Sequence, residues 1–244
     1  MAAQQSDASE AQNPHVVAEQ RPTSIQVEAQ QSDASEKTDA YEEKSFSRKE
    51  IFRQRYESLP EEDREAWLKK SNEVAKKAIE NIRKKKGRRM SDRNRITPTA
   101  VCVAIDMRTG KVLSVGFSGR DDYPSELDFL PIVDKLQQRI DAVKEEAAND
   151  LTNTDKHRKK QSYKDWPVDN CAEVDAVNKA LMRDETLEIK DIFINTRRIS
   201  PNKSKKRKKL AGAYEPPCEN CQRTFHDAVF LPFEGIQNIY DQTE

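Results

Sequence analysis

Hydrophobic positions divide the chain into an unpatterned N-terminal part and a patterned remainder. Residues 1–44 are of low complexity, and the octapeptide AQQSDASE occurs in them twice, at 3–10 and 29–36. Neither copy contains a large apolar residue that a core could bury. We therefore interpret residues 1–44 as a disordered acidic tail with a duplicated segment.

From residue 45 onward, apolar residues recur at helical spacing. They predict two helices that meet at Pro60, because proline is tolerated at a helix start and the acids at 61–63 complement the helix dipole. We interpret residues 45–96 as a helical and basic extension of the folded domain. Its apolar positions are Phe46, Ile51, Phe52, Tyr56, Leu59, Trp67, Leu68, Val74, Ala75, Ala78, Ile79 and Ile82.

Residues 97–244 alternate between strand and helix patterns. Apolar runs at 99–105 and 111–117, joined by a turn, predict a hairpin of two buried strands. The other expected elements are helices over 131–149, 171–182 and 218–229, a strand over 189–196 and an edge strand over 236–240. The order β-β-α-α-β-α is typical of a layered α/β domain.

Composition and charge agree with this division. Hydrophobic and charged residues each make up 35% of the chain, which is too polar for a core along its full length. The net charge of zero combines a tail of nine acids and three bases, at −6, with a remainder at +6. No stretch approaches the roughly 20 apolar residues of a membrane helix, and the N-terminus lacks the pattern of a secretory signal. We expect no membrane association and an intracellular location, cytoplasmic or nuclear, with export by dedicated machinery as the alternative.

Two basic clusters raise the question of a nucleic-acid partner. Residues 83–95 hold eight bases and one acid, and Lys203–Lys209 hold six bases in seven positions. Such clusters attract phosphate backbones or act as nuclear import signals. Neither is interleaved with aromatic residues, so a solvated linker is the simpler interpretation of each. Nothing in the pattern indicates a protein partner.

The cysteines carry the chemistry of the sequence. Cys218 and Cys221 are three residues apart at an expected helix start, so their sulfurs share a face and can bind one ion. With Cys171 they supply three ligands, and a catalytic zinc site keeps its fourth position for water. Glu173 follows Cys171 by two residues, near enough to reach that water without binding the metal.

These residues predict a particular division of roles. Three thiolates around Zn²⁺ leave a net charge of −1, which we expect the two helix starts to offset. The spacing matches the signature of zinc deaminases, with cysteine in the first ligand position. In such a reaction Glu173 would accept the proton of the water and pass it to the ring nitrogen of the base, and then to the departing amine.

The segments YKDWPVDNCAEVDAVNKAL, at 163–181, and PPCENCQRTF, at 216–225, resemble the YwqJ-like branch of the cytidine deaminase superfamily. The hairpin TAVCVAIDMRTGKVLSVGFSG, at 99–119, fits the opening strands of that branch. The resemblance implies a three-layer fold with a mixed five-stranded sheet flanked by helices and Zn²⁺ between two helix starts. It further implies hydrolytic deamination of a nucleobase, in a free nucleotide or in a nucleic acid. A catalytically silent zinc-stabilised binding protein and a toxin-type module are the alternatives.

Two further residues, Cys102 and His226, are of types that bind metal but are not expected to join the site. Cys102 would complete a structural four-cysteine site, but it lies in an apolar strand, where a small hydrophobe is its ordinary role. His226 follows Cys221 by five residues, so we expect it to face elsewhere on the helix.

Five residues are candidates for binding substrate. Asn170 and Gln222 flank the ligands, where either could contact substrate. The alternative is helix capping for Asn170 and a surface contact for Gln222. Phe117, Ser118 and Gly119 follow from the resemblance alone, which implies that the exit of the second strand lines the pocket.

Overall fold

The centre of the fold is a mixed sheet. The computed structural model describes residues 47–87, 98–120, 129–199 and 210–240. Its strands are β1 (Ala100–Asp106), β2 (Lys111–Phe117), β3 (Ile192–Arg198) and β4 (Val229–Phe230). In the described residues they form one four-stranded sheet in the order β2-β1-β3-β4. β1 is antiparallel to β2 and β3, whereas β3 is parallel to β4, so the expected mixed sheet is confirmed.

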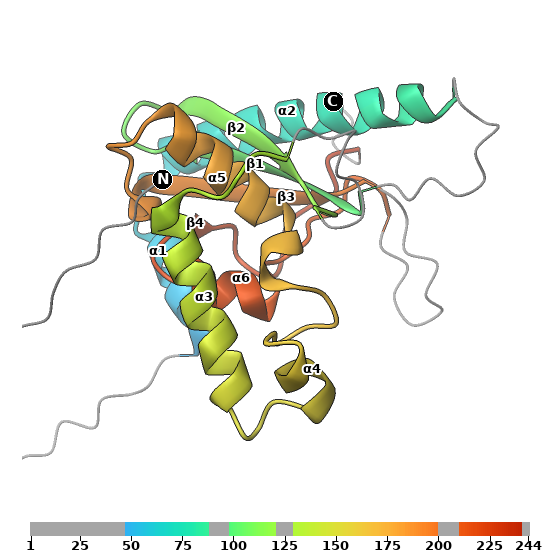
Figure 1. Ribbon diagram of the computed structural model, residues 1–244. Coiled ribbons are helices and arrows are strands. Elements are labelled where there is room, and N and C mark those ends of the chain that lie inside the picture. Colours follow the sequence, from blue (N-terminus) through green and yellow to red (C-terminus); the bar gives the residue numbers. More distant parts are fainter. Residues whose placement is uncertain (1–46, 88–97, 121–128, 200–209, 241–244) are drawn as a thin grey trace, which may run out of the picture. The chain divides into compact units, whose positions relative to one another are not determined.

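Helices cover both faces of this sheet (Figure 1). The α-helices are α1 (Arg48–Glu57), α2 (Glu61–Gly87), α3 (Asp134–Asn149), α4 (Asp155–Lys159), α5 (Ala172–Arg183) and α6 (Glu219–Thr224). Two 3-10 turns, η1 (Val168–Asn170) and η2 (Ile189–Asp191), precede α5 and β3. α2 contacts three strands from one face and α5 contacts the same strands from the other. This is the three-layer α/β arrangement expected from the sequence.

β1 separates two hydrophobic clusters, because successive side chains of a strand point to opposite faces. Cys102 and Ala104 pack with apolar residues of α3 and α5. Val101, Val103 and Ile105 pack with apolar residues of α1 and α2. All five are fully buried. Burial on both faces explains why the sequence of this strand is an unbroken apolar run.

α2 is attached to the sheet by polar as well as apolar contacts. The rings of Trp67 in α2 and Phe193 in β3 have centroids 5.9 Å apart. Asn72 Oδ1 accepts hydrogen bonds from Arg197 Nη2 at 2.7 Å and from Asn195 Nδ2 at 2.9 Å. Arg197 is fully buried, and burial lowers its pKa to about 10. Because a buried guanidinium without hydrogen-bond partners is costly, α2 is a structural part of the sheet domain.

Two elements near the C-terminus differ from the expectation. The helix expected over 218–229 ends at Thr224, and the chain then enters β4. The edge strand expected over 236–240 is not formed, because Asn238 Oδ1 accepts the backbone N–H of Tyr240 at 2.9 Å. A side chain that binds the backbone two residues onward favours a turn. The described residues therefore give four strands where the resemblance implied five.

Several expectations fall on parts of the chain that the structure does not describe. The acidic tail at 1–44, most of the basic cluster at 83–95 and the whole of Lys203–Lys209 lie outside the described residues. Of the segments 47–87, 98–120, 129–199 and 210–240, none contains a helix with the length and apolar character that a membrane crossing requires.

The close contact between β2 and α5 depends on Gly116. A Cβ atom at this position would lie 2.2 Å from the backbone nitrogen of Ala176 and 2.5 Å from the carbonyl oxygen of Ala172. Beside it, Ser114 Oγ donates a hydrogen bond to the carbonyl oxygen of Ala176 at 2.6 Å. The strand and the helix thus approach more closely than a residue with a side chain would permit.

We expect Gly116→Ala to destabilise the protein, because the added methyl group meets helix backbone that cannot rotate away. The loss should reach about 1–3 kcal/mol or more, the usual range for an overpacked core. Denaturant unfolding measures it. Gly235→Ala is the comparison variant, because Gly235 has φ of 78° and no atom within 4 Å of the added Cβ, so its loss reports backbone strain without a steric contact. Unfolding of Gly116→Ala at the wild-type denaturant concentration would contradict the steric argument.

Candidate metal centre

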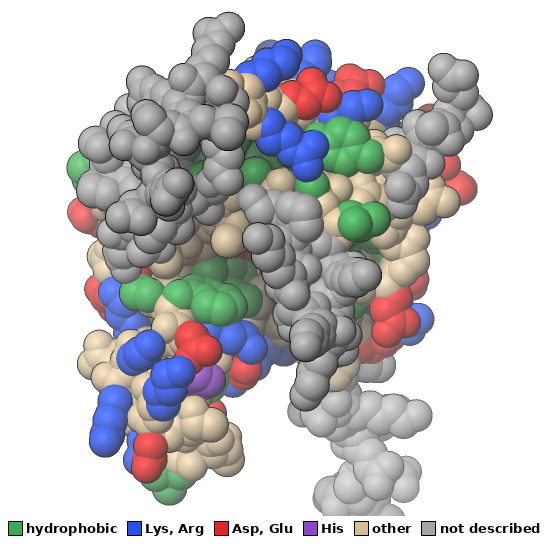
Figure 2. All heavy atoms as spheres, turned by 90° about the vertical axis from the view of Figure 1, so that its right-hand side faces the viewer, with side chains coloured by type: hydrophobic (Ala, Val, Ile, Leu, Met, Phe, Trp, Pro, Cys, Tyr) green, Lys and Arg blue, Asp and Glu red, His purple; other side chains and the backbone are tan. Residues whose placement is uncertain are grey.

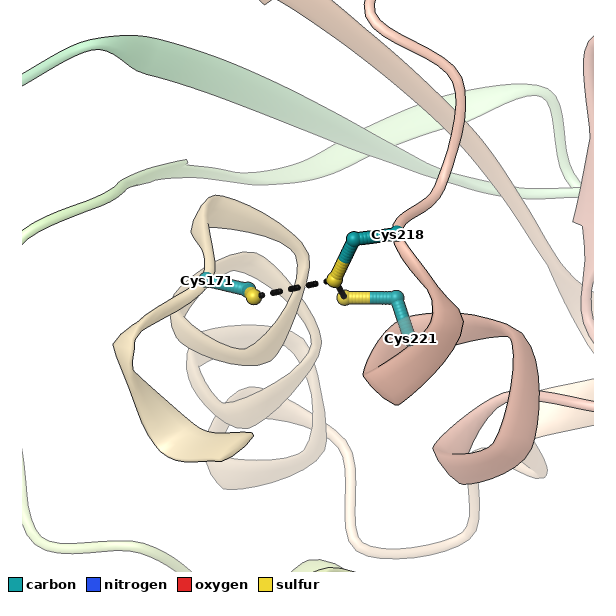
Figure 3. A group of neighbouring side chains, drawn as sticks. All are labelled: Cys171, Cys218 and Cys221. Carbon is teal, nitrogen blue, oxygen red and sulfur yellow. Dashed lines mark hydrogen bonds between the residues drawn. The ribbon is translucent and has the colours of Figure 1, made fainter. Parts of the chain in front are cut away.

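Three cysteines converge from two helix starts (Figure 3). Cys171 is the N-cap of α5, and Cys218 is the N-cap of α6. Both have the extended backbone conformation that an N-cap adopts. Cys221 lies in the first turn of α6, three residues after Cys218, so both sulfurs point toward Cys171. Local helix geometry sets the direction of each side chain, and the sheet brings the two helices together.

The three sulfur atoms lie at separations suited to one metal ion. The Sγ atoms of Cys171 and Cys218 are 3.5 Å apart, and those of Cys218 and Cys221 are 3.7 Å apart. All three lie within 4.8 Å of one another, and all three cysteines are free thiols. Metal–thiolate bonds of about 2.3 Å in tetrahedral geometry place two sulfurs about 3.8 Å apart. The group can therefore hold a metal ion.

The three thiols differ in acidity. Hydrogen bonds shared with the other two thiols, and then those from the backbone at Asn220 and Cys221, lower the pKa of Cys218. The hydrogen bond to Cys218 raises the pKa of Cys171, and burial raises the pKa of Cys221. One thiolate is thus favoured at Cys218, and a bound cation would favour ionisation of the other two.

Glu173 lies beside this group, in the first turn of α5. Its side chain is buried, with 6% exposure, and Thr196 Oγ1 of β3 donates a hydrogen bond to Oε1 at 3.1 Å. Burial, and secondarily the charge of Cys218, raises the pKa of Glu173 to about 7. A carboxyl group that is fixed in direction and changes ionisation near neutral pH is suited to proton transfer.

Two of the cysteines and Glu173 open onto one cleft of about 1220 Å³. Its walls come from the start of α1, the facing ends of β1 and β3, and the segments before α5 and α6. Cys171, Cys218 and Glu173 all line it. A molecule bound in this cleft would therefore reach the sulfur group and the carboxyl group together.

Asn170 and Gln222, the two candidates that flank the cysteines, both line the cleft. The carbonyl oxygen of Asn170 accepts the N–H of Gly119 at 3.1 Å, which joins the end of β2 to the approach to α5. Gln222 Nε2 donates to the carbonyl oxygen of Pro217 at 2.9 Å. Each residue thus supports the loop that precedes a cysteine of the group.

The candidates at the end of β2 divide between two faces. Ser118 lines the cleft, where its Oγ accepts the N–H groups of Thr99 and Ala100, each at 3.0 Å. Phe117 does not line the cleft, because alternation along the strand turns its side chain to the cluster beneath α2. The expectation that Phe117 lines the pocket is therefore corrected, and Ser118 is seen to hold the start of β1.

Cys102 and His226 lie outside the sulfur group. Cys102 is fully buried among the apolar residues of β1, and burial raises the pKa of its thiol. His226 is exposed, with its Nδ1 3.2 Å from the carbonyl oxygen of Arg223. Within the described part of the chain, the three-cysteine group is the one arrangement of possible ligands that fits a metal ion.

Two residues of the site were not anticipated from the sequence. The indole Nε1 of Trp166 donates to Cys171 Sγ at 3.3 Å, and Thr196 positions Glu173 from β3. The sequence carried one signal for each residue. Trp166 lies five residues before Cys171, and Thr196 is a polar residue inside an apolar strand. Neither signal identifies a partner, because both contacts arise from the tertiary fold.

Asn220, between the two cysteines of α6, joins that helix to the segment before α5. Its Oδ1 accepts the N–H of Tyr163 at 2.9 Å, and its Nδ2 donates to Ser162 Oγ at 3.0 Å. Asn220 is fully buried, so both hydrogen bonds are sheltered from water. This side chain fixes one ligand-bearing segment against the other.

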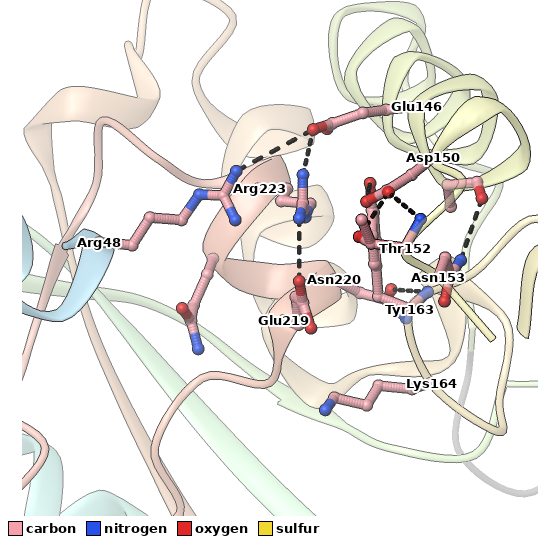
Figure 4. A network of polar contacts seen from close by, with 12 residues as sticks. Arg48, Glu146, Asp150, Thr152, Asn153, Tyr163, Lys164, Glu219, Asn220 and Arg223 are labelled. Atoms are coloured by element: carbon pink, nitrogen blue, oxygen red, sulfur yellow. Dashed lines mark hydrogen bonds and ion pairs between the residues drawn. The ribbon is translucent and has the colours of Figure 1, made fainter. Parts of the chain in front are cut away.

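A wider polar network surrounds that junction (Figure 4). Arg223 of α6 lies over the ring of Tyr163, with its Cζ 3.6 Å from the centroid. Arg223 also pairs with Glu146 of α3 and, at 2.9 Å, with Glu219. Tyr163 in turn donates its hydroxyl to Asp150 Oδ2 at 3.2 Å. The network ties α3, α6 and the loop after α3 into one support for the cysteines.

Comparison with protein-family models, with curated proteins and with solved structures yields no match.

We expect one metal ion per chain, because the three sulfurs converge on one point. Cys218→Ala should lose the ion, since two ligands bind far more weakly than three. Elemental analysis of protein purified without added chelator measures the ratio.

Cys102→Ala is the matched control. It also removes a buried cysteine, but one that lies outside the sulfur group, so the metal content should stay at one per chain. Loss of metal in both variants would favour a four-cysteine site, and wild-type protein free of metal would exclude the centre altogether.

Proposed function

We propose that this protein is a zinc-dependent hydrolytic deaminase of nucleobases, in the YwqJ-like branch of the cytidine deaminase superfamily. The observation that carries the proposal is a buried, hydrogen-bonded glutamate beside three converging cysteines, two of which line one cleft with it. Resemblance in sequence supplies the reaction class, and the geometry of Cys171, Cys218, Cys221 and Glu173 supports it.

Zinc is the metal that best suits this set of donors. Three thiolates favour a soft or borderline ion, and a tetrahedral ion held by three cysteines keeps one position open. When bound, Zn²⁺ supplies a Lewis acid that lets water act as a nucleophile near neutral pH. The N–H of Trp166 at Cys171, and the backbone N–H groups at Cys218, spread the negative charge of the thiolates.

Glu173 moves the protons in the proposed reaction. It takes a proton from water as the water oxygen attacks the ring carbon that bears the amino group. It then protonates the adjacent ring nitrogen and transfers the second water proton to the amine, which leaves as ammonia while the ring carbon becomes a carbonyl. Thr196 holds the carboxyl group in one orientation through these transfers.

We expect Glu173→Gln to reduce ammonia release at least about 100-fold, because the amide cannot relay a proton. The amide keeps the volume and can still accept from Thr196, so zinc content should be unchanged. Ammonia release is measured on a panel of nucleosides, nucleotides and single-stranded oligonucleotides with amino-bearing bases.

Glu219→Gln is the matched control for this experiment. Glu219 lines the same cleft but pairs with Arg223 at 2.9 Å, so its loss should change the rate only by a few-fold. Equal activity of wild type and Glu173→Gln would remove Glu173 from the mechanism. A zinc-loaded wild type that deaminates no base on the panel would instead favour a zinc-stabilised binding protein.

A further inference from the structure

We propose that the rim of the cleft formed by Trp166, Lys164 and α4 binds a single-stranded polynucleotide, so that the substrate base belongs to a polymer. This inference rests on the proposed deaminase function and names its substrate class. DNA and RNA single strands share the chemistry that such a rim recognises, which is a stackable base next to a chain of phosphates.

Trp166 provides a fixed and exposed aromatic surface at the cleft. Its side chain lines the cleft, and 40% of the residue is exposed. The indole N–H is anchored to Cys171 Sγ at 3.3 Å, which holds the ring in one orientation while leaving part of it open. Its anchor is a metal ligand, so a base stacked on Trp166 would neighbour the base that reacts.

Basic residues extend this surface away from the metal centre. The segment 155–165, which contains α4, has five lysines and arginines against two aspartates, a net charge of +3. Lys164 itself lines the cleft. Lys156 pairs with Asp165 at 2.6 Å, and Lys160 donates to the carbonyl oxygen of Asp165 at 2.9 Å. Asp165 lies between Lys164 and Trp166, so these contacts place α4 directly beside the cleft.

Lysines and arginines gather next to an exposed apolar surface on the face shown in Figure 2. That juxtaposition is what distinguishes a single-strand interface from an ordinary solvated basic loop, because bases need a stacking surface and phosphates need nearby cations. The two basic clusters recognised in the sequence lacked an aromatic partner. The segment 155–165 is followed directly by Trp166, and the fold places that ring at the cleft.

Two further basic residues line the cleft, Arg48 and Lys49 at the start of α1, of which Arg48 lies 4.0 Å from Glu146. Two of the acids that line the cleft already have partners, because Glu215 pairs with Arg198 at 2.8 Å and Glu219 pairs with an arginine of α6. Together with Lys164, these cations favour an anionic ligand in the cleft.

The cleft has room for a base and part of its neighbouring nucleotides. Its volume of about 1220 Å³ lies above the roughly 300–1,000 Å³ of most small-molecule sites. A base paired inside a duplex cannot reach a metal on the floor of a cleft, whereas a single strand can turn one base inward. Neighbouring nucleotides can then lie along Trp166 and α4.

The binding experiment uses zinc-loaded full-length Glu173→Gln protein, so that no turnover occurs. Fluorescence anisotropy with labelled single-stranded DNA and RNA of about 12 nucleotides should show saturable binding. A mononucleotide and a duplex of the same sequence should compete at least tenfold less well. Salt should weaken binding, with a slope of about 0.7 per phosphate contact.

Lysine variants locate the phosphate contacts. Lys160→Ala and Lys164→Ala should each make the salt dependence shallower by about 0.7. Lys190→Ala is the matched control, because Lys190 is an exposed lysine of η2 that does not line the cleft, and its salt slope should equal that of the parent protein. Equal effects of all three changes would overturn the location of the surface.

Tryptophan variants test the stacking surface. Trp166→Ala should weaken oligonucleotide binding on the order of tenfold, whereas Trp166→Phe should largely retain it, since phenylalanine keeps an aromatic face but loses the N–H. Zinc content is measured on both, so that a disturbed metal site is recognised. Equal losses in the two variants at full zinc content would overturn the role of the ring.

The two proposals fail in different ways. Oligonucleotides that bind no more tightly than mononucleotides would overturn the polymer inference, even if the wild type deaminates a free nucleotide. Tight, Trp166-dependent oligonucleotide binding by a wild type that releases no ammonia would support the surface and refute the proposed reaction.

Discussion

Gly116 brings the backbone of β2 against the backbone of α5, and the candidate site depends on that approach. The carbonyl oxygen of Ala172 and the nitrogen of Ala176 occupy the space that any side chain at 116 would need. One residue further along β2, the N–H of Phe117 binds Asp175 Oδ2 at 3.0 Å. These contacts fix the first turn of α5, which carries Glu173 and follows directly on Cys171. A shift of this turn would move the carboxyl group and one sulfur together, away from the two sulfurs of α6.

The site gathers buried acidic groups, and the groups that donate hydrogen bonds to them carry no charge. Three thiols and Glu173 lie within one small region, and the contacts that stabilise negative charge there are N–H groups and a hydroxyl. Such donors stabilise an anion without neutralising it, so the electrostatic demand for a divalent cation persists. The cations near the site, at Lys164 and Arg48, lie on the walls of the cleft. Acidic groups thus gather around the sulfur group, while Lys164 and Arg48 line other parts of the same cleft.

The three-cysteine group could be predicted from local spacing together with the resemblance, because the residues within each of its two segments are close in sequence. Cys218 and Cys221 share a helical face, and Glu173 follows its neighbouring ligand within one turn. The tertiary contacts were not predictable in the same way: Thr196 reaches Glu173 across a sheet, and Trp166 reaches Cys171 through a turn of irregular chain. The end of α6 was misjudged because the apolar residues before 230 fit a short strand as well as a continued helix, and periodicity does not separate the two.

The buried guanidinium of Arg197 has a consequence for where the functional unit begins. Its partner Asn72 lies in α2, more than a hundred positions earlier in the chain, and both residues sit on the face of the sheet opposite the cysteines. A shortened chain that began at the first strand would expose the apolar cluster under α2 and leave this cation without its amide oxygen. We therefore expect the sheet domain to need α1 and α2 for its folding. The sheet and the helices after it do not form an independently folding unit on their own.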